Sequence, residues 1–463
     1  MRALRVPRTA ARRIVYPLKD AVIRRDTLAV LAELRASERL PRRELAGLQT
    51  HRLRRILRHA YEHVPYYREV FSERGLVPED IRTPADLRKL PVLTKEIIRA
   101  RGDDLVAEGP WRRRAQRVTT SGSTGAAISV LCDSSSMSFR LANQLRGKEW
   151  HGAGIGDPEI RLWHNRGADG ASSLAGRAFW NANLVKDRLL NIRVLQGADL
   201  TDESLARWEQ LLRRTKPDAI YGYAASLYYL ARFLRERNVP PDELRTKLVV
   251  LAAEKIVPSQ KQLVTEAFAS PVVDEYGCAE YGILAFECPQ GRLHSSDESV
   301  VLEVPEPGPG GAGELHVTTL TNFATPLIRY RLGDVVSLSS EECPCGRSLG
   351  VIGEVAGRTT DFLVRRDGGR THPFQINLVL QELEKIVRYR VVQQSVGVVE
   401  LIVQLSSPLD PLETGQILAE FHDALGEQVE VRIRSVESVP RTPGGKASFL
   451  VSLVDQADPT ARA

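Results

Sequence analysis

The stretch "DAIYGYAASLYYLARFLRERNVPPDELRTKLVVLAAE", residues 218–254, indicates the fold. It contains a short β-prone run at 218–223, an amphipathic helical pattern at 226–238 and a second β-prone run at 246–254. A strand, a helix and a strand in this order predict a right-handed crossover between parallel strands. The alternation continues with another helical pattern and another β-prone run. We therefore predict an α/β fold on a mostly parallel sheet.

The pattern changes on both sides of this core. Apolar residues at steps of three and one in residues 51–64 predict a helix that Pro65 ends, and residues 1–108 as a whole look helical. Residues 109–358 are predicted to form the α/β core with a β-rich subdomain, including a strand pair within 299–320. Residues 359–463 are predicted to form a small, mobile α+β lid domain. Its expected strands lie at 398–405 and 429–436, and its expected helices at 376–387 and 415–425.

Composition narrows the class of protein. The chain has 463 residues, of which 43% are hydrophobic and 26% are charged, and no apolar run is long enough to span a bilayer. With no secretory signal pattern, these values predict a cytoplasmic, well-folded protein of several structural units. The net charge of +6 is concentrated near the N-terminus. That basic start is either a solvated helix face or a contact with an anionic membrane surface. No aromatic and basic module supports nucleic-acid binding.

The loop "TTSGSTG", residues 119–125, has two physical interpretations. Glycines and hydroxyl side chains allow backbone N–H groups to converge on phosphate oxygens, but the same composition also suits a flexible surface loop. It is not a Walker loop, because Ala127 lies five residues after Gly122, where that motif requires its second glycine, followed by lysine.

Four metal-binding residue types form a second pattern. Cys288 and His294 are six residues apart, and Cys343 and Cys345 follow about 50 residues later. Three thiolates and an imidazole suit a tetrahedral structural Zn²⁺, while free reduced thiols are the alternative. Five scattered cysteines in a chain of this length do not indicate a disulfide framework.

Five ordered stretches point to one enzyme superfamily. Residues 119–125, "DEYGCAEYG" (274–282), "TPLIRYRLGDVV" (325–336), "GEVAGRTTDFLV" (353–364) and "PRTPGGKASFLVS" (440–452) together resemble the ANL adenylate-forming enzymes. The N-terminal stretch from residue 53 and the stretch 216–234 resemble the phenylacetate-CoA ligase branch and its CapK-like relatives. Some of those relatives also carry a similar arrangement of three cysteines and a histidine.

The resemblance implies binding roles for ATP. The β- and γ-phosphates would be held by the loop residues Thr119, Thr120, Ser121, Gly122, Ser123, Thr124 and Gly125. Adenine would be framed by Asp274, Tyr276 and Gly277, with Ala253 and Glu254 beside it. Asp334 would bind the ribose hydroxyls, and Arg358 would lie near the ribose and phosphate.

The resemblance also implies catalytic roles. Glu280 would ligate Mg²⁺, and Lys446 would reach the α-phosphate and the carboxylate of the substrate. The acyl site is expected near Tyr221, Tyr223 and Ser226.

The expected reaction is ATP- and Mg²⁺-dependent activation of a carboxylic acid, aryl or related, as acyl-AMP, followed by transfer to CoA. Transfer to a carrier-protein thiol, an amine or a hydroxyl is an alternative, and a non-catalytic nucleotide-binding scaffold is another. Three departures from the family pattern stand out. The loop lacks a following lysine, Ala279 replaces a hydroxyl residue, and Thr360 replaces the first acidic residue of the hinge, which puts domain rotation in question.

Overall fold

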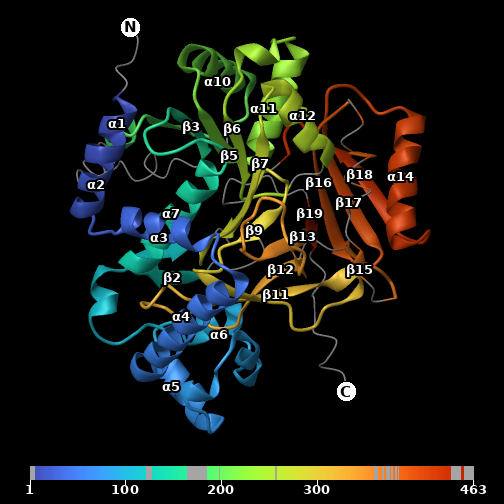
Figure 1. Cartoon of the computed structure of the whole chain (residues 1–463). Helices are drawn as coiled ribbons and strands as arrows, with labels where there is room; N and C mark the ends of the chain where they lie inside the picture. The colour runs from blue at the N-terminus through green and yellow to red at the C-terminus, as the bar shows by residue number, and fades with distance from the viewer. Residues whose placement is uncertain are drawn as a thin grey trace. The chain divides into compact units, whose positions relative to one another are not determined.

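The chain divides into two compact units in a computed structural model (Figure 1). The larger unit comprises residues 1–120, 128–332 and 337–354, and the smaller comprises residues 121–127, 333–336 and 355–463. The structure describes residues 6–120, 128–163, 185–197, 199–255, 258–358, 363–367, 370–371, 376, 379–380, 383, 385–439 and 450–452. The α/β fold class predicted from the sequence is confirmed.

Helices dominate the first 115 residues. In α4 the side chains of Leu53, Ile56, Leu57 and Ala60 are fully buried, and Pro65 opens the next helix, where its missing N–H is harmless. The helix predicted from the apolar spacing is therefore confirmed. The helical elements are α1 (Arg8–Ala10), the π-helical turn η1 (Ala11–Val15), α2 (Tyr16–Val22), α3 (Thr27–Ser37), α4 (Arg42–His63), α5 (Pro65–Glu73), η2 (Pro78–Asp80), η3 (Pro84–Lys89), α6 (Lys95–Ala100) and η4 (Pro110–Arg114).

A sheet of 11 strands forms the centre of the larger unit, in the order β10-β11-β12-β13-β9-β8-β7-β6-β5-β3-β4. The strands β4, β3, β5, β6 and β7 are mutually parallel, whereas β7–β8, β8–β9 and β9–β13 pair antiparallel. The predicted pair within 299–320 is the antiparallel β10–β11. The strands are β3 (Glu159–Trp163), β4 (Ile192–Gln196), β5 (Ala219–Tyr223), β6 (Leu248–Ala252), β7 (Val272–Cys278), β8 (Gly282–Glu287), β9 (Leu293–Ser295), β10 (Val300–Glu303), β11 (Ala312–Thr319), β12 (Tyr330–Ser339) and β13 (Val351–Arg358).

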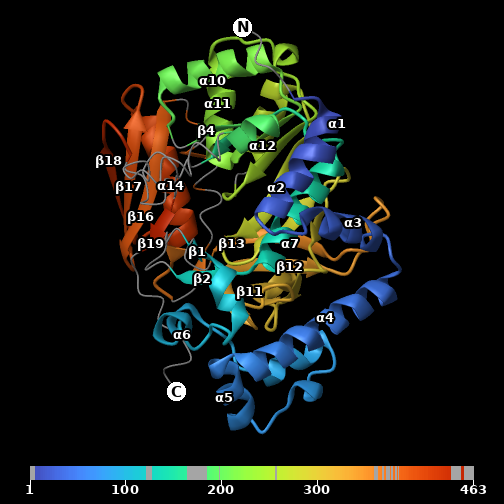
Figure 2. The ribbon, with the colours of Figure 1, turned by 90° about the vertical axis from the view of Figure 1, so that its left-hand side faces the viewer.

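Helices cover both faces of the parallel strands (Figures 1 and 2). Successive side chains of a strand point to opposite faces. In β5, Ile220 packs in a cluster with three helices, and Tyr221 packs on the other side with Phe286 and the end of α7. These helices are α7 (Ser134–Glu149), α10 (Asp202–Thr215), α11 (Ala224–Glu236) and α12 (Pro258–Phe268), and η5 (Pro241–Glu243) precedes β6.

A separate hairpin frames the predicted phosphate loop. Strands β1 (Gln116–Thr119) and β2 (Ser129–Cys132) pair antiparallel, and residues 121–127 between them lie outside the described residues. Thr120 and Ile128 close the described part of the hairpin: the Thr120 N–H donates to the Ile128 carbonyl at 3.0 Å, and the Ile128 N–H donates to Thr120 Oγ1 at 3.1 Å.

The smaller unit has a core of its own. A four-stranded sheet in the order β18-β17-β16-β19 packs against α14 through residues such as Val391, Leu401 and Phe421. The strands predicted at 398–405 and 429–436 and the helix at 415–425 are confirmed. The helix predicted at 376–387 is wrong at its end, because β16 begins at Ile386. The elements are β14 (Leu363–Val364), β15 (Arg370–Thr371), β16 (Ile386–Ser395), β17 (Val398–Leu405), α14 (Pro411–Leu425), β18 (Glu430–Ser435) and β19 (Leu450–Ser452).

Among the described residues, no helix combines the length and the apolar character needed to cross a membrane.

Candidate active site and cysteine cluster

Several predicted site residues follow the carboxyl ends of neighbouring parallel strands. Tyr223 ends β5, Ala253 and Glu254 follow β6, and Tyr276 extends β7 past the end of β6. The edge of a parallel sheet where the strands end is where open α/β proteins bind ligands. Residues predicted from separate motifs for adenine and for the acyl group are thus brought to one edge of the sheet.

An aromatic pair stands at this edge. The Tyr223 ring stacks on Trp163, which ends β3, with ring centroids 4.3 Å apart and an interplanar angle of 14°. Tyr221 lies deeper: its hydroxyl donates to Glu275 at 2.7 Å, and burial raises the pKa of both groups. The hydroxyl of Ser226 is buried and already has a partner, because it donates to the Gly197 carbonyl at 2.7 Å. Of the three predicted acyl-site residues, Tyr223 stacks on Trp163, and Tyr221 contacts the same ring in a tilted arrangement with centroids 5.2 Å apart.

The turn after β6 holds an unfavourable backbone conformation. Ala253 has a φ of +68°, in the left-handed region that side chains with a Cβ disfavour. The next residue, Glu254, accepts a hydrogen bond from the Ala225 N–H at 3.1 Å. That N–H lies in the first turn of α11, whose N–H groups have no partner within the helix. Strained non-glycine residues concentrate at functional sites, and this one coincides with the predicted adenine site.

Asp274 has a partner that sequence reasoning missed. Lys261 of α12 donates to Asp274 Oδ2 at 2.8 Å and to Glu287 Oε2 at 2.5 Å. Burial alone would lower the pKa of Lys261. The nearby carboxylates of Asp274 and Glu287 have the larger effect, and the pKa of Lys261 is raised. The side chain of Asp274 is about half exposed. The structure therefore ties this predicted adenine-binding carboxylate to a lysine.

Glu280 lies in the turn between β7 and β8. Its side chain is buried, and Tyr330 of β12 donates to Glu280 Oε1 at 3.1 Å. Gly277, opposite the turn, tolerates no side chain, because a Cβ there would lie 2.3 Å from the Gly282 carbonyl oxygen. A close β7–β8 approach therefore places the predicted magnesium ligand.

Arg140 of α7 holds this turn from the other side. Its Nη1 and Nη2 both donate to the Ala279 carbonyl at 2.8 Å. Gly282 makes room for the arginine stem, since a Cβ at Gly282 would lie 2.4 Å from Arg140 Cγ. Arg140 thus fixes the backbone immediately before Glu280.

The cysteine cluster is a separate site in the larger unit. Cys288 follows β8, His294 lies in β9, and Cys343 and Cys345 lie in the loop between β12 and β13. The pairing of Val351 with His294 brings that loop to the β8–β9 turn.

The ligand atoms of the four residues lie within 4.8 Å of one another. The Cys288 and Cys343 sulfurs are 3.7 Å apart, and Cys345 Sγ is 3.2 Å from His294 Nε2. Zn–S bonds of about 2.3 Å at a tetrahedral angle place two sulfurs about 3.8 Å apart, so the residues fit a zinc ion. His294 Nδ1 lies 3.2 Å from the Leu349 carbonyl, which can hold the imidazole with Nε2 toward the sulfurs.

The pKa shifts of the cluster residues favour metal ligation at His294 and Cys345 and oppose it at Cys343. Burial lowers the pKa of His294, which keeps its imidazole neutral and able to ligate. Burial raises the pKa of the Cys343 thiol to about 11 in the absence of metal. Burial also opposes ionisation of Cys345, but hydrogen bonds from Arg347 outweigh it and lower the pKa of that thiol.

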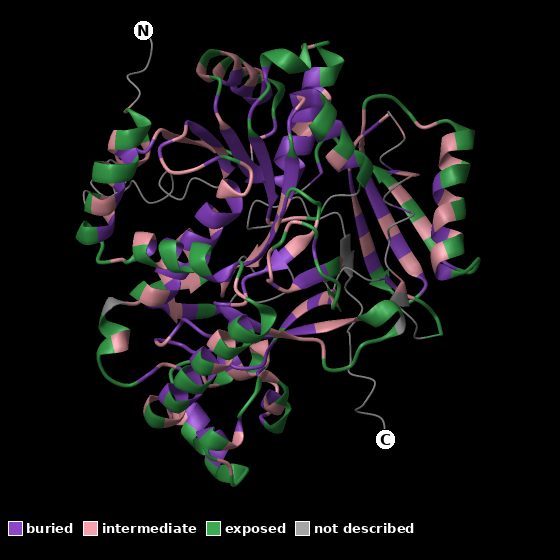
Figure 3. Cartoon of the chain, viewed as in Figure 1, coloured by how far each residue is buried: buried purple, intermediate pink, exposed green. Residues whose placement is uncertain are grey.

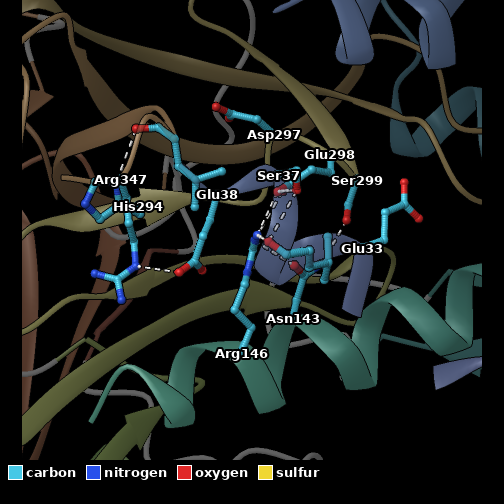
Figure 4. A network of polar contacts seen from close by, with 12 residues as sticks. Glu33, Ser37, Glu38, Asn143, Arg146, His294, Asp297, Glu298, Ser299 and Arg347 are labelled. Atoms are coloured by element: carbon cyan, nitrogen blue, oxygen red, sulfur yellow. Dashed lines mark hydrogen bonds and ion pairs between the residues drawn. The ribbon is translucent and has the colours of Figure 1, made fainter. Parts of the chain in front are cut away.

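A buried network of polar contacts lies near the cluster (Figure 4). Arg146 of α7 pairs with Glu298 at 2.7 Å, and Ser37 of α3 donates to the same carboxylate at 2.6 Å. Arg347, next to the cluster, lies 3.5 Å from Glu38 and 4.3 Å from the centre of the Trp150 ring. These contacts join the N-terminal helices to the loops that carry the cysteines.

Comparisons with known proteins agree with this arrangement. The chain is 28% identical to the phenylacetate-coenzyme A ligase of Thermus thermophilus, over 90% of this chain and 98% of that protein. It is 24% identical to the protein CapK of Staphylococcus aureus, over 88% and 89%. Residues 363–452 match the family model described as the CapK C-terminal domain. Together these similarities support an adenylate-forming enzyme of the ANL superfamily, in the phenylacetate-CoA ligase and CapK branch.

The solved structure of a 2-hydroxyisobutyryl-CoA ligase in complex with R3-HIB-AMP has the same fold. It superposes with a TM-score of 0.70 at 22% identity, covering 92% of each chain. That likeness shows the fold, and the curated phenylacetate-coenzyme A ligase relatives support an adenylate-forming ligase.

The remaining predicted residues of this adenylate-forming enzyme divide into three groups. Thr119 ends β1, where its hydroxyl lies 2.8 Å from that of Ser129, and Asp334 is buried in β12. Arg358 ends β13, and only its backbone is described. Lys446, Thr360 and the loop residues 121–125 lie outside the described residues, so their roles stay predictions.

Trp163, Lys261 and Arg140 were missed by sequence reasoning. Trp163 ends the β-prone run "EIRLW", and an aromatic residue at the end of a parallel strand was an available signal. Arg140 and Lys261 lie on helices rich in polar residues, where nothing local distinguishes a cation paired with another element from a solvated one.

Proposed function

We propose that this enzyme activates a carboxylic acid with ATP as an acyl adenylate and then transfers the acyl group to CoA. The observation that carries the proposal is the gathering of Tyr223, Glu254, Tyr276 and Glu280 at one edge of the sheet. Full-length relatives named as phenylacetate-coenzyme A ligases support the choice of reaction.

The first step joins the acid to AMP. A carboxylate oxygen of the acid attacks the α-phosphorus of ATP, and the bond from that phosphorus to the leaving pyrophosphate breaks. The loop 119–125 is assigned to the β- and γ-phosphates, and Asp334 to the ribose hydroxyls. Lys446 stabilises negative charge on the α-phosphoryl oxygens as the transition state forms. Glu280 would hold Mg²⁺, which supplies further positive charge to the phosphates.

The second step passes the acyl group on. The CoA thiol gives up its proton to solvent, its sulfur attacks the acyl carbon, and the bond from that carbon to the AMP oxygen breaks, so that AMP leaves with the bonding electron pair. Hinge rotation at Thr360 and Asp361 is proposed to admit the thiol. A carrier-protein thiol or an amine in place of CoA would follow the same bond changes.

The aromatic pair supports a flat or aryl acid as the substrate. The partly buried Trp163 and the buried Tyr223 form a stacked aromatic pair at the carboxyl ends of β3 and β5. Aromatic side chains favour offset stacking with a second ring. An aryl or arylacetic acid would therefore gain more from this pair than a short aliphatic acid.

Exchange of pyrophosphate into ATP tests the first step. With a panel of aryl, arylacetic and short aliphatic acids, we expect acid-dependent exchange that is fastest for aryl members. Lys446→Ala should reduce the exchange rate roughly 100-fold or more, because a positive charge at the reacting phosphate is lost. Lys89→Ala, on the surface 3₁₀-helix η3, is the matched control and should exchange at the rate of the native enzyme.

Two results would contradict the proposal. No exchange with any acid would favour a nucleotide-binding scaffold, and unchanged exchange in Lys446→Ala would remove that residue from the mechanism. Competition between acceptors tests the second step. Formation of a hydroxamate or an amide that does not depend on CoA would show that the acceptor is an amine and not CoA.

We also propose a structural zinc ion bound by Cys288, His294, Cys343 and Cys345. The sulfur separation of 3.7 Å and the His294 Nδ1 contact with Leu349 support it. The cluster belongs to the β8–β9 turn and the β12–β13 loop, whereas Tyr223, Ala253 and Glu254 end or follow parallel strands. The ion would therefore stabilise those loops and take no part in acyl transfer.

A further inference from the structure

Large exposed apolar side chains concentrate near the N-terminus. Of the ten that the described residues include, six lie in residues 14–23 and 185–189. We call these six the N-terminal apolar surface: Ile14, Leu18, Val22, Ile23, Val185 and Leu189. Ile14, Leu18 and Val22 are 64%, 62% and 73% exposed and recur every four residues, which places them along one face of a helix.

The two segments of this surface are neighbours in space. Tyr16 and Leu190 pack in one buried cluster. Asn191, next in the chain, binds the backbone of Val6 on both sides: its Oδ1 accepts from the Val6 N–H at 3.1 Å, and its Nδ2 donates to the Val6 carbonyl at 2.8 Å. The start of the chain is thus held against the segment that carries Val185 and Leu189.

The opposite face of the N-terminal helix, residues 8–22, makes the contacts that hold it to the fold. Arg8 pairs with Asp157 at 3.0 Å and also with Asp218. Gly156 allows the helix to approach, because a Cβ there would lie 2.8 Å from the Ala11 Cβ. Tyr16 is buried. These contacts hold the helix through the face opposite the exposed apolar stripe.

Positive charge surrounds the apolar stripe. Between residues 8 and 25 the chain has six basic side chains and one acidic one, Asp20, which is buried and accepts a hydrogen bond from Thr27. Arg12, Arg13 and Arg24 are exposed at the two ends of the stripe. In the second segment Arg188 is exposed, and Asp187 is paired with Lys186 at 3.4 Å. Figure 3 shows exposed positions along this helix, at the upper left.

We propose that the N-terminal apolar surface binds the surface of an anionic lipid bilayer. An apolar helix face bordered by arginines is the arrangement of helices that lie in the membrane interface, with the apolar side chains among the acyl chains and the cations at the headgroups. The helix is about 22 Å long at 1.5 Å per residue, so it would lie along the surface and not span the bilayer. The charge complementarity favours lipid over a second copy of this basic chain.

Vesicle cosedimentation of the full-length protein tests the proposal. We expect binding to phosphatidylcholine vesicles doped with phosphatidylglycerol, weakening as salt is added, and little binding to phosphatidylcholine alone. Leu18→Glu with Val22→Glu should lower the partition coefficient roughly tenfold or more, because two apolar side chains no longer enter the interface. Arg12→Gln with Arg13→Gln should lower it by about fivefold per charge.

Leu412→Glu is the matched control, because Leu412 of α14 is 73% exposed, as Val22 is. It should leave vesicle binding unchanged, and all variants should keep native ATP–pyrophosphate exchange, which shows that they fold. Equal binding of the native protein and Leu18→Glu/Val22→Glu would overturn the proposal. A native dimer that this double substitution dissociates, with no vesicle binding, would also overturn it and assign the surface to a second copy.

Discussion

At the scale of single residues, Arg140 is the side chain that positions the turn before Glu280. Both of its terminal nitrogens donate to one carbonyl, that of Ala279, and the adjacent Gly277 and Gly282 leave no space for the turn to move inward. A charged donor of this kind typically contributes about 1.5–3 kcal/mol. Arg140 touches no reacting atom in this arrangement, so it acts through Glu280.

Arg140→Leu is expected to free the turn and impair the magnesium site. The concentration of Mg²⁺ needed for half-maximal ATP–pyrophosphate exchange should rise roughly tenfold. That factor corresponds to a loss of about 1.4 kcal/mol in the free energy of Mg²⁺ binding when Glu280 is no longer held in place. Arg140→Lys, which keeps one charged donor, should recover part of the affinity. The measurement is exchange rate against Mg²⁺ concentration at saturating ATP.

The control for Arg140 is Arg35→Leu, which removes an arginine of α3 that pairs with Glu149 at the end of α7. It should leave the Mg²⁺ dependence unchanged. If Arg140→Leu lowers thermal stability but keeps the native Mg²⁺ dependence, Arg140 is only a structural residue and does not position Glu280.

At the scale of elements, the cysteine cluster joins two loops that are 55 residues apart in the chain. The β9–β13 pairing brings His294 to the loop of Cys343 and Cys345, and Cys288 closes the site from the β8–β9 turn. A metal that binds only the folded protein stabilises it by about 4 kcal/mol at a thousandfold excess over Kd. Loss of the metal should therefore lower the stability of this part of the larger unit first.

Protein purified without chelators is expected to contain about one zinc per chain by elemental analysis. Cys343→Ser should lose the metal and lower the melting temperature by roughly 5 °C, because an unfolding entropy of about 2.1 cal/mol/K per residue gives about 1.4 °C per kcal/mol for a unit of this size. Cys132→Ala, at a buried cysteine outside the cluster, should retain full zinc content. Native protein with well under one zinc, or Cys343→Ser with full zinc, would show that the cluster consists of free thiols.

The elements also show how far the sequence could be interpreted. Parallel strands and their crossover helices were predictable, because β5, β6 and β7 have local apolar patterns and α11 and α12 have helical ones. Strand β16 was missed because "IVRYRVVQQS" carries arginines and glutamines among its apolar residues and follows a helical pattern. Its antiparallel partner β17 follows after two residues, but its parallel partner β19 lies more than 50 residues further along the chain. Local propensity cannot supply such a partner.

At the scale of the whole molecule, the sequence predicts which residues form the candidate site and their order along the chain. It does not predict which side chains they contact. Glu280 follows from its motif, yet its buried contact with Tyr330 depends on a strand 50 residues away. The Lys261 bridge between Asp274 and Glu287 likewise joins a helix to two strands. Such partners are determined when the sheet assembles. A single sequence therefore indicates the chemical groups of the site but not their arrangement in space.

Histidine burial links the stability of the larger unit to pH. His316 of β11 is buried, and its Nδ1 has no hydrogen-bond partner among the described residues. Burial lowers the pKa of His316 from 6.5 to about 4, and Arg329 and Arg331 act in the same direction. Between pH 6.5 and pH 4, His316 is therefore protonated in the unfolded chain and neutral in the folded protein. The contribution to stability is full above pH 6.5 and is lost as the pH falls from there toward 4.

The free energy of unfolding of the larger unit should accordingly fall between pH 7 and pH 4.5 by about 2 kcal/mol more in the native protein than in His316→Gln. Urea unfolding at several pH values, followed by tryptophan fluorescence, measures this, because all five tryptophans lie in residues 111–208, within the range of the larger unit. His51→Gln, at an exposed histidine of α4, is the control and should keep the native pH dependence. Because two units can unfold separately, the comparison uses the transition reported by tryptophan and not a global midpoint. Parallel curves for the native protein and His316→Gln would mean that His316 is protonated in the folded state.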